Sequence, residues 1–155
     1  MNESTNNALI DLLIKNEEAI GSLYKACALQ FPGFAEFWQK IALEEKAHAD
    51  VLRELAKHLQ NQKVLLNHRK FNTTAVQTTI DYILKQREKV ESGSMTLLQV
   101  LAAAQDIEQS IVDRDFFEVF ETDSASMRLE FAALRKHTVE HTACITAALN
   151  KLRNP

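Results

Sequence analysis

Apolar residues recur every three or four positions along five segments of the chain, which is the spacing of amphipathic α-helices. The five expected helices span residues 5–30, 34–59, 75–90, 97–121 and 126–152. Pro32 and Gly33 interrupt the pattern between the first two segments, and so short a connection favours an antiparallel helical hairpin. The pattern therefore predicts four long helices, with the shorter segment 75–90 as a crossover between the second and third of them.

Each long helix carries an ionisable residue in the middle of its apolar stripe. In the second helix, Glu45 and His48 are three positions apart and share a face with the apolar Ile41 and Leu52. A buried carboxylate without a partner is costly, so Glu45 requires a proton, a cation or a metal. The apolar faces of the other three long helices contain Glu17, Glu108 and His141. In a bundle, these residues meet in one central layer.

The two halves of the chain show the same order of polar and apolar positions, which indicates an internal repeat. The aligned pairs are Glu17 with Glu108, Tyr24 with Asp115, Glu45 with Thr138 and His48 with His141. Each half is thus predicted to be a helix with a central glutamate, followed by a helix with an inward histidine.

The expected cluster of carboxylates and imidazoles has the composition of a two-metal site. In di-iron and di-manganese carboxylate proteins, two helices each supply a glutamate and two others each supply a Glu-x-x-His motif. Carboxylate oxygens suit iron and manganese, and a mixed oxygen and nitrogen site also accepts zinc. Thr138 replaces the glutamate of the second motif, so five of the usual six ligands remain. His137, one turn before His141, is a candidate for the sixth ligand.

Several residues of the first half resemble the rubrerythrin-like branch of the ferritin-like superfamily. They are Glu17 with Tyr24, the Phe37–Trp38 pair and the motif Glu44-Glu45-x-x-His48-Ala49. The resemblance covers nearly the whole chain and is strongest in the first half. It implies a single all-α domain over residues 1–155, folded as a ferritin-like, antiparallel four-helix bundle. Its long crossover, residues 60–95, would contain the extra short helix.

The same resemblance implies a redox protein in which bound iron reacts with peroxide or dioxygen. Its metal ligands would be Glu17, Glu45, His48, Glu108 and His141. Tyr24 would orient a ligand carboxylate by hydrogen bonding. Gln105 stands where the family pattern has an additional acid, and Asp115 stands where the second half would repeat the tyrosine. No rubredoxin-like module follows the bundle, so electrons are expected from a separate donor protein, and the resemblance also implies a homodimer.

Thr138 leaves a second interpretation open, in which a ferritin-like bundle keeps a degenerate site that binds metal without catalysis, or serves a structural role. An iron-storage cage is a third. Taken singly, each inward polar residue is also compatible with a hydrogen-bonded, metal-free core, but three acids and two imidazoles at one depth favour bound cations. His137 and His141 share a spacing with hemerythrins, although the other His/Glu pairs of that class are missing.

The composition excludes several other classes. The net charge is −3 and the Lys and Arg residues are scattered, which argues against nucleic acid or an anionic membrane as a partner. No apolar run approaches the ~20 residues that cross a bilayer. Cys27 and Cys144 form no Cys-x-x-Cys motif, so no iron–sulfur or zinc-ribbon site is expected. The N-terminus lacks the features of a signal peptide, so a cytoplasmic location is expected.

Overall fold

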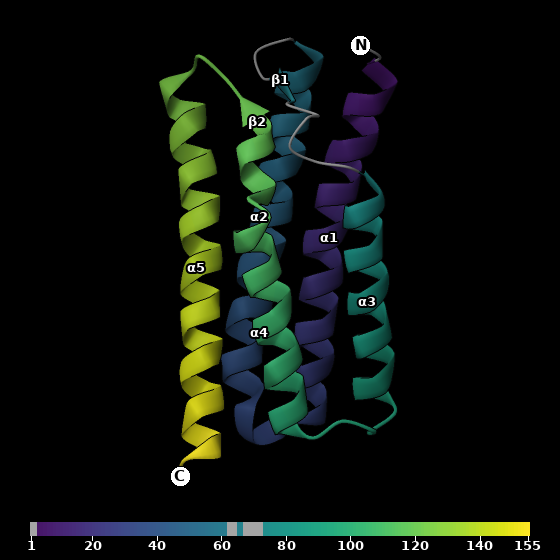
Figure 1. Cartoon of the computed structure of the whole chain (residues 1–155), viewed down its shortest axis with the longest axis vertical. Helices are drawn as coiled ribbons and strands as arrows, with labels where there is room; N and C mark the ends of the chain where they lie inside the picture. The colour runs from purple at the N-terminus through teal and green to yellow at the C-terminus, as the bar shows by residue number, and fades with distance from the viewer. Residues whose placement is uncertain (1–2, 62–64, 67–72) are drawn as a thin grey trace.

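Helices α1 (Glu3–Gln30) and α2 (Ala35–Gln60) form an antiparallel hairpin in the computed structural model, which describes residues 3–61, 65–66 and 73–155. The 3-10 turn η1 (Pro32–Phe34) joins them, and it begins with a proline, whose missing N–H is not needed at such a start. The two helices lie side by side along most of their length (Figure 1). Between them, the rings of Tyr24 and Trp38 are fully buried, with centroids 5.4 Å apart.

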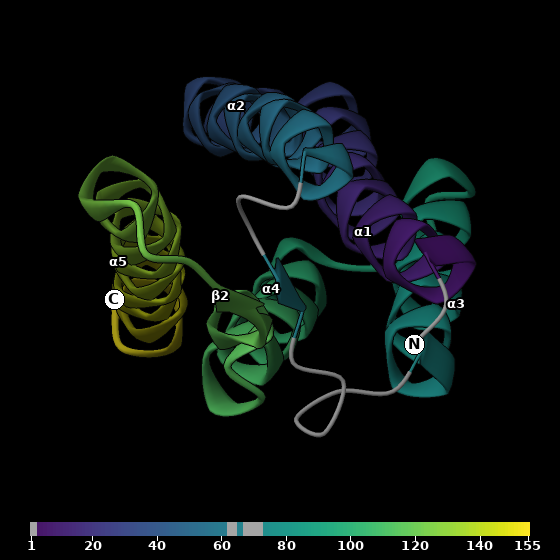
Figure 2. The same cartoon turned by 90° about the horizontal axis from the view of Figure 1, so that it is seen from above.

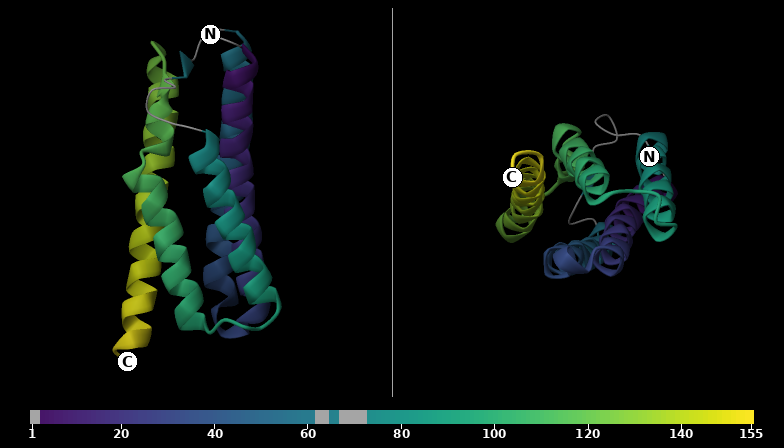
Figure 3. Two further views of the ribbon diagram at one scale, coloured as in Figure 1. Left: turned by 45° about the vertical axis from the view of Figure 1, so that its right-hand side comes forward. Right: turned by 90° about the horizontal axis from the view of Figure 1, so that it is seen from below.

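Helices α4 (Leu97–Asp113) and α5 (Ala125–Arg153) form a second antiparallel pair. A capping box starts α4, because the Thr96 hydroxyl accepts from the N–H of Gln99 while the Gln99 side chain accepts from the N–H of Thr96. Ser124 caps α5 in a similar way by accepting from the N–H of Met127. This pair stands beside the group formed by the other helices (Figure 3).

Helix α3 (Thr73–Glu91) belongs to the crossover and packs against α1, on the side opposite α2 (Figure 2). Its buried apolar side chains are Val76, Ile80, Ile83 and Val90. The expected crossover over residues 60–95 therefore contains the short helix that the sequence predicts. Residues 62–64 and 67–72 of that stretch lie outside the described part of the chain.

A two-residue strand in the crossover pairs with the connection between α4 and α5. Strand β1 (Leu65–Leu66) is antiparallel to β2 (Phe120–Glu121), and Leu65 is opposite Glu121 while Leu66 is opposite Phe120. This pairing has no counterpart in the sequence-based expectations. The pairing attaches the crossover to the end of the second helical pair at which α4 connects to α5.

The third long helix is shorter than the sequence pattern predicts. A helix over residues 97–121 is wrong, because α4 ends at Asp113 and is followed by the 3-10 turn η3 (Phe116–Val119) and by β2. Asp115 has a φ of 48°, in the left-handed region, where a right-handed helix cannot continue. The apolar spacing persists beyond Asp113 because η3 buries three of its four residues. The other four helices begin and end within two residues of the expected bounds.

Apart from that end, the expected all-α antiparallel bundle with a crossover helix is confirmed. One apolar core runs between all five helices and includes the buried face of η3. Among the helices that the structure describes, none has the length and apolar composition needed to cross a membrane.

Candidate metal centre

Four helices direct ionisable residues into the middle of the bundle. The residues, each no more than 3% exposed, are Glu17 of α1, Glu45 and His48 of α2, Glu108 of α4 and His141 of α5. On α2, one helical turn separates the two residues, so their side chains point the same way. Helix α1 lies close to α2 at this level, because a Cβ at Gly21 would be 3.5 Å from the Cβ of Glu45. The structure thus brings together all five residues that the sequence analysis selects as ligands.

The five residues form two groups that share one carboxylate. In the first group, Nδ1 of His48 lies 3.3 Å from Oε2 of Glu17 and 3.4 Å from Oε2 of Glu45. In the second group, Nδ1 of His141 lies 2.6 Å from Oε1 of Glu45 and 3.7 Å from Oε1 of Glu108. Within each group, one potential ligand atom from every residue lies within 4.8 Å of the others. Glu45 therefore contributes one oxygen to each group.

Several potential ligand atoms in these groups are buried and, among the described residues, make at most ion-pair contacts with one another and no hydrogen bond of regular geometry. They are Oε1 of Glu45, Oε2 of Glu108, Nδ1 of His48 and Nδ1 of His141. An unpartnered buried polar atom costs about 1–3 kcal/mol, so a folded protein usually supplies a partner. A metal cation in each group would be such a partner, and carboxylate oxygens with imidazole nitrogens suit iron, manganese or zinc. The residues present therefore fit a pair of metal ions.

The outer nitrogen of each central histidine also has a partner. Nε2 of His141 donates to Oε2 of Glu44 at 2.5 Å, so Nδ1 faces the centre and offers a lone pair to a metal once it has lost its own proton. Nε2 of His48 lies 3.3 Å from Nδ1 of His137, and the two rings stack with centroids 5.5 Å apart. Both central histidines are thus oriented with Nδ1 inward, His141 by a carboxylate and His48 by another imidazole.

Tyr24 makes the contact that the sequence analysis expects of it. Its hydroxyl is fully buried and donates to Oε1 of Glu108 over 2.5 Å. Burial, together with the charge of Glu108, raises the pKa of Tyr24 well above its usual value. The hydroxyl therefore stays protonated and continues to donate.

The structure places His137 and Thr138 outside both groups of potential ligands. His137 is exposed on α5 and contacts the outer nitrogen of His48. Thr138 is buried, and its hydroxyl donates to the backbone oxygen of Leu134 in the same helix. The position that aligns with Glu45 therefore holds a threonine, and the hydroxyl of this threonine donates its hydrogen bond within α5 instead of acting as a ligand at the centre.

Gln105 and Asp115 have partners away from the centre. Gln105 donates from Nε2 to the hydroxyl of Thr146 at 2.7 Å, which connects α4 to α5. Asp115 lies after the end of α4, is 42% exposed and pairs with Arg135 at 3.6 Å. The alignment of Asp115 with Tyr24 fails because the helix that would have carried it inward ends two residues earlier.

Burial and mutual contact shift the pKa values of the centre in the chain without metal. Burial, reinforced by the charge of Glu45, raises the pKa of both Glu17 and Glu108. Burial opposes ionisation of Glu45 too, but its contacts with the two histidines outweigh burial and lower its pKa. Burial disfavours the charged imidazoles, yet the carboxylates around them raise the pKa of His48 to about 10 and that of His141 to about 11. Protons thus offset the carboxylate charge, and metal binding has to displace them.

Glu44 contacts the centre although the sequence analysis does not select it as a site residue. Its side chain is 41% exposed, as expected one position from Glu45, but its length lets it reach across to α5. The sequence did contain a signal for this role, since a histidine that binds metal through one nitrogen needs an acceptor for the other. Glu44 directly precedes Glu45 on α2, and it was therefore a candidate acceptor for a histidine of a neighbouring helix.

The model of the rubrerythrin family matches residues 10–123, about three quarters of the chain. This segment contains four of the five central residues, whereas α5 and its His141 lie beyond it. No curated protein and no solved structure matches the chain. The place of His141 in the centre therefore rests on the structure itself.

Proposed function

The chain belongs to the rubrerythrin family, and on this basis we propose that it is an iron-dependent redox protein whose reduced centre reacts with peroxide or dioxygen. The iron would be held by Glu17, Glu45, His48, Glu108 and His141. The observation that carries the proposal is the division of these residues into two buried groups that share Glu45. Glu45 would be available to both ions, which together would supply the two electrons that the reduction of a peroxide takes up.

The side chains around the ligands hold them in a defined orientation. Glu44 accepts a hydrogen bond from Nε2 of His141, so the inner nitrogen is the one that can offer its lone pair to a metal, and the imidazole becomes a stronger donor. Tyr24 fixes the carboxylate of Glu108 by its buried hydrogen bond. Such fixed donors need little reorganisation when the charge of the centre changes.

Two ferrous ions in the centre would supply the two electrons that convert one hydrogen peroxide and two protons into two waters. The ligands themselves are at most 3% exposed, so bulk water is kept from the reacting groups. Iron is the metal that the family favours, while manganese and zinc suit the same donor atoms.

The reaction consumes two electrons, so we propose a separate electron-donor protein as a partner. We also propose that the chain forms a homodimer in the cytoplasm. A solution mass near twice that of one chain, measured by analytical ultracentrifugation, would support the dimer, whereas a monomer would contradict it. A much larger mass would instead indicate a storage cage.

A second candidate function is metal binding without catalysis, and Thr138 favours it. Its hydroxyl is bonded within its own helix, so the second group has only three ligands, one of them shared. Such a group would hold metal less tightly than the complete four-helix pattern does. The protein would then contain about one metal per chain and show no reaction with peroxide.

The experiment loads the purified protein anaerobically with ferrous iron, removes unbound metal, and then mixes it with hydrogen peroxide. We expect two iron ions per chain, and we expect one peroxide to oxidise both of them. The oxidation is monitored by absorbance in a stopped-flow instrument. Glu45→Gln should lose iron from both groups because each uses this carboxylate. Glu140→Gln, an exposed change on α5, is the matched control and should behave as the native protein.

Two outcomes would decide against the redox proposal. Protein that binds no iron would contradict both candidate functions. Protein that binds iron, but whose iron reacts with neither peroxide nor dioxygen, would support the non-catalytic alternative.

A further inference from the structure

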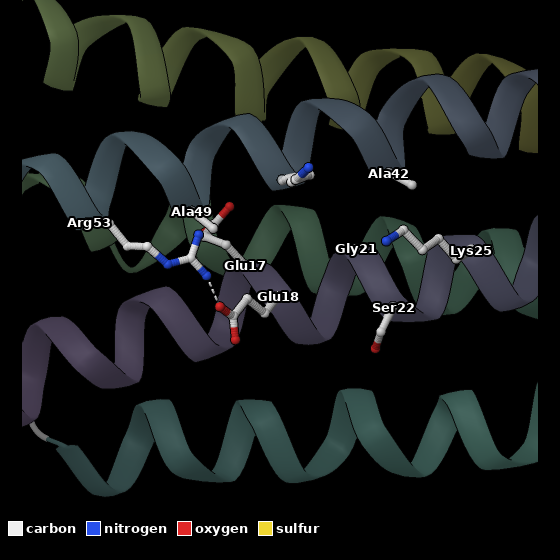
Figure 4. Close-up of a pocket in the computed structure, with 9 residues that line it drawn as sticks. Glu17, Glu18, Gly21, Ser22, Lys25, Ala42, Ala49 and Arg53 are labelled. Carbon is white, nitrogen blue, oxygen red and sulfur yellow. Dashed lines mark hydrogen bonds and ion pairs between the residues drawn. The ribbon is translucent and has the colours of Figure 1, made fainter.

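A pocket of about 220 Å³ lies on the seam between α1 and α2 (Figure 4). Small residues leave the space open, since Gly21, Ala42 and Ala49 line it. Glu17 also lines the pocket although it is only 2% exposed. The pocket therefore reaches the side of the metal centre that α1 provides.

Three cationic side chains line this pocket, and they differ in their partners. Arg53 reaches across the seam to Glu18, as Figure 4 shows, and it also pairs with Asp50 at 2.7 Å. Lys25 and Lys46 make no hydrogen bond or ion pair with any residue in the described ranges. In Figure 4 the Lys25 side chain extends along the seam toward the Arg53 side of the pocket. Two lysines without an ion-pair partner among the described residues thus line the same pocket as the carboxylates of Glu17 and Glu18.

The pocket has more cationic than acidic lining residues, three against Glu17 and Glu18, and this excess is a local exception. The whole chain has a net charge of −3 and its Lys and Arg residues are scattered. The hollow on the other side of α2, of about 130 Å³, borders His48 and has Glu130 and His137 among its described lining residues, which include no Lys or Arg. The two hollows beside α2 therefore differ in their charged lining residues, since only the one between α1 and α2 contains Lys and Arg side chains.

We propose that the pocket between α1 and α2 binds a small inorganic anion, held by the ammonium groups of Lys25 and Lys46 beside Glu17. A cavity of about 220 Å³ has room for an oxyanion of the size of phosphate together with a few waters. Lysine binds such anions as a point charge with three donors. Arg53 is already paired with Glu18 and Asp50, so the two lysines are the cations available to an anion.

This inference does not depend on the proposed redox function, because neither lysine is a candidate metal ligand. It can therefore be tested on the metal-free chain, and its failure would leave the iron chemistry untouched. Inorganic phosphate is a suitable probe because it carries up to two negative charges. Two ammonium groups therefore attract it more strongly than they attract chloride.

The test titrates inorganic phosphate into the full metal-free protein at constant ionic strength, set with sodium chloride, and records amide NMR shifts. We expect saturable shifts at Gly21, Ser22 and Ala42. Replacing both Lys25 and Lys46 by Gln should weaken binding at least tenfold, since each ammonium contributes about fivefold. Both lysines are exposed, so the double variant should fold normally, which circular dichroism would verify.

Lys40→Gln is the matched control, because Lys40 is exposed on α2 and does not line the pocket. It should bind phosphate as the native chain does. Three results would each overturn the proposal: no saturable shift, shifts that map to residues away from the pocket, or equal binding by the native protein and the double variant.

Discussion

Replacing Tyr24 with phenylalanine removes one hydroxyl from the metal centre and leaves the packing of the ring in place. The hydroxyl donates to Oε1 of Glu108 over 2.5 Å, in a fully buried contact. The ring packs against Trp38 with centroids 5.4 Å apart, and phenylalanine retains that contact. The substitution therefore isolates one hydrogen bond to one candidate ligand.

The expected effect follows from the role of that hydrogen bond in orienting a ligand. The Tyr24 hydroxyl holds the Glu108 carboxylate in place, and no bulk water reaches Glu108 to replace it. Partners that orient a metal ligand typically contribute about 10- to 100-fold to metal affinity, so removing this one should weaken binding roughly 30-fold. Glu108 belongs to only one of the two groups, so this loss should fall on the group of Glu45, Glu108 and His141. The group of Glu17, Glu45 and His48 should keep its affinity.

Titration with cobalt(II), followed by its visible absorbance and by calorimetry, resolves the two binding steps. Tyr24→Phe should weaken one step about 30-fold and leave the other unchanged. Tyr82→Phe on α3, where the ring is 42% exposed, is the control and should change neither step. The reasoning would be refuted if Tyr24→Phe weakened both steps equally, or had no effect on either.

Four further predictions follow from the same contacts. Glu44→Gln should weaken metal binding next to His141 at least tenfold, measured by calorimetry, because a neutral amide orients the imidazole less well; unchanged affinity would show that Glu44 has no such role. Thr138→Glu should add a ligand, raising the rate of ferrous oxidation, and should destabilise the metal-free chain in urea by about 2 kcal/mol; if neither changes, the position does not face the centre. Iodoacetamide should alkylate the exposed Cys144 and spare Cys27, because burial raises the pKa of the Cys27 thiol to about 12; equal rates by mass spectrometry of the native protein would contradict the packing of α1. Removing metal with a chelator should lower the melting temperature, since a ligand at a hundred times its Kd stabilises by about 2.7 kcal/mol; an unchanged melting temperature would mean that no metal binds the folded state.

The helical periodicity predicted most of the centre because burial in a bundle follows directly from the face of a helix. Glu17, Glu45, His48, Glu108 and His141 were selected as polar residues within apolar stripes, and all five meet in the core. The periodicity also located the hairpin of α1 and α2 and the crossover helix α3.

The remaining features depend on local backbone or side-chain geometry that periodicity does not report. The end of α4 depends on the left-handed conformation of Asp115, while the apolar spacing continues past it. The role of Glu44 depends on a long side chain that reaches a neighbouring helix from a partly exposed position. The pairing of β1 with β2 involves two residues on each strand, too few for any sequence period.

The central claim is that two metal ions share the carboxylate of Glu45. A crystal structure of the iron-loaded protein, with anomalous data collected at the iron absorption edge, tests it most directly. We predict two anomalous peaks in the bundle core, each beside an oxygen of Glu45, with one next to His48 and the other next to His141. A map without peaks at these residues, or with iron only at the protein surface, would contradict the claim.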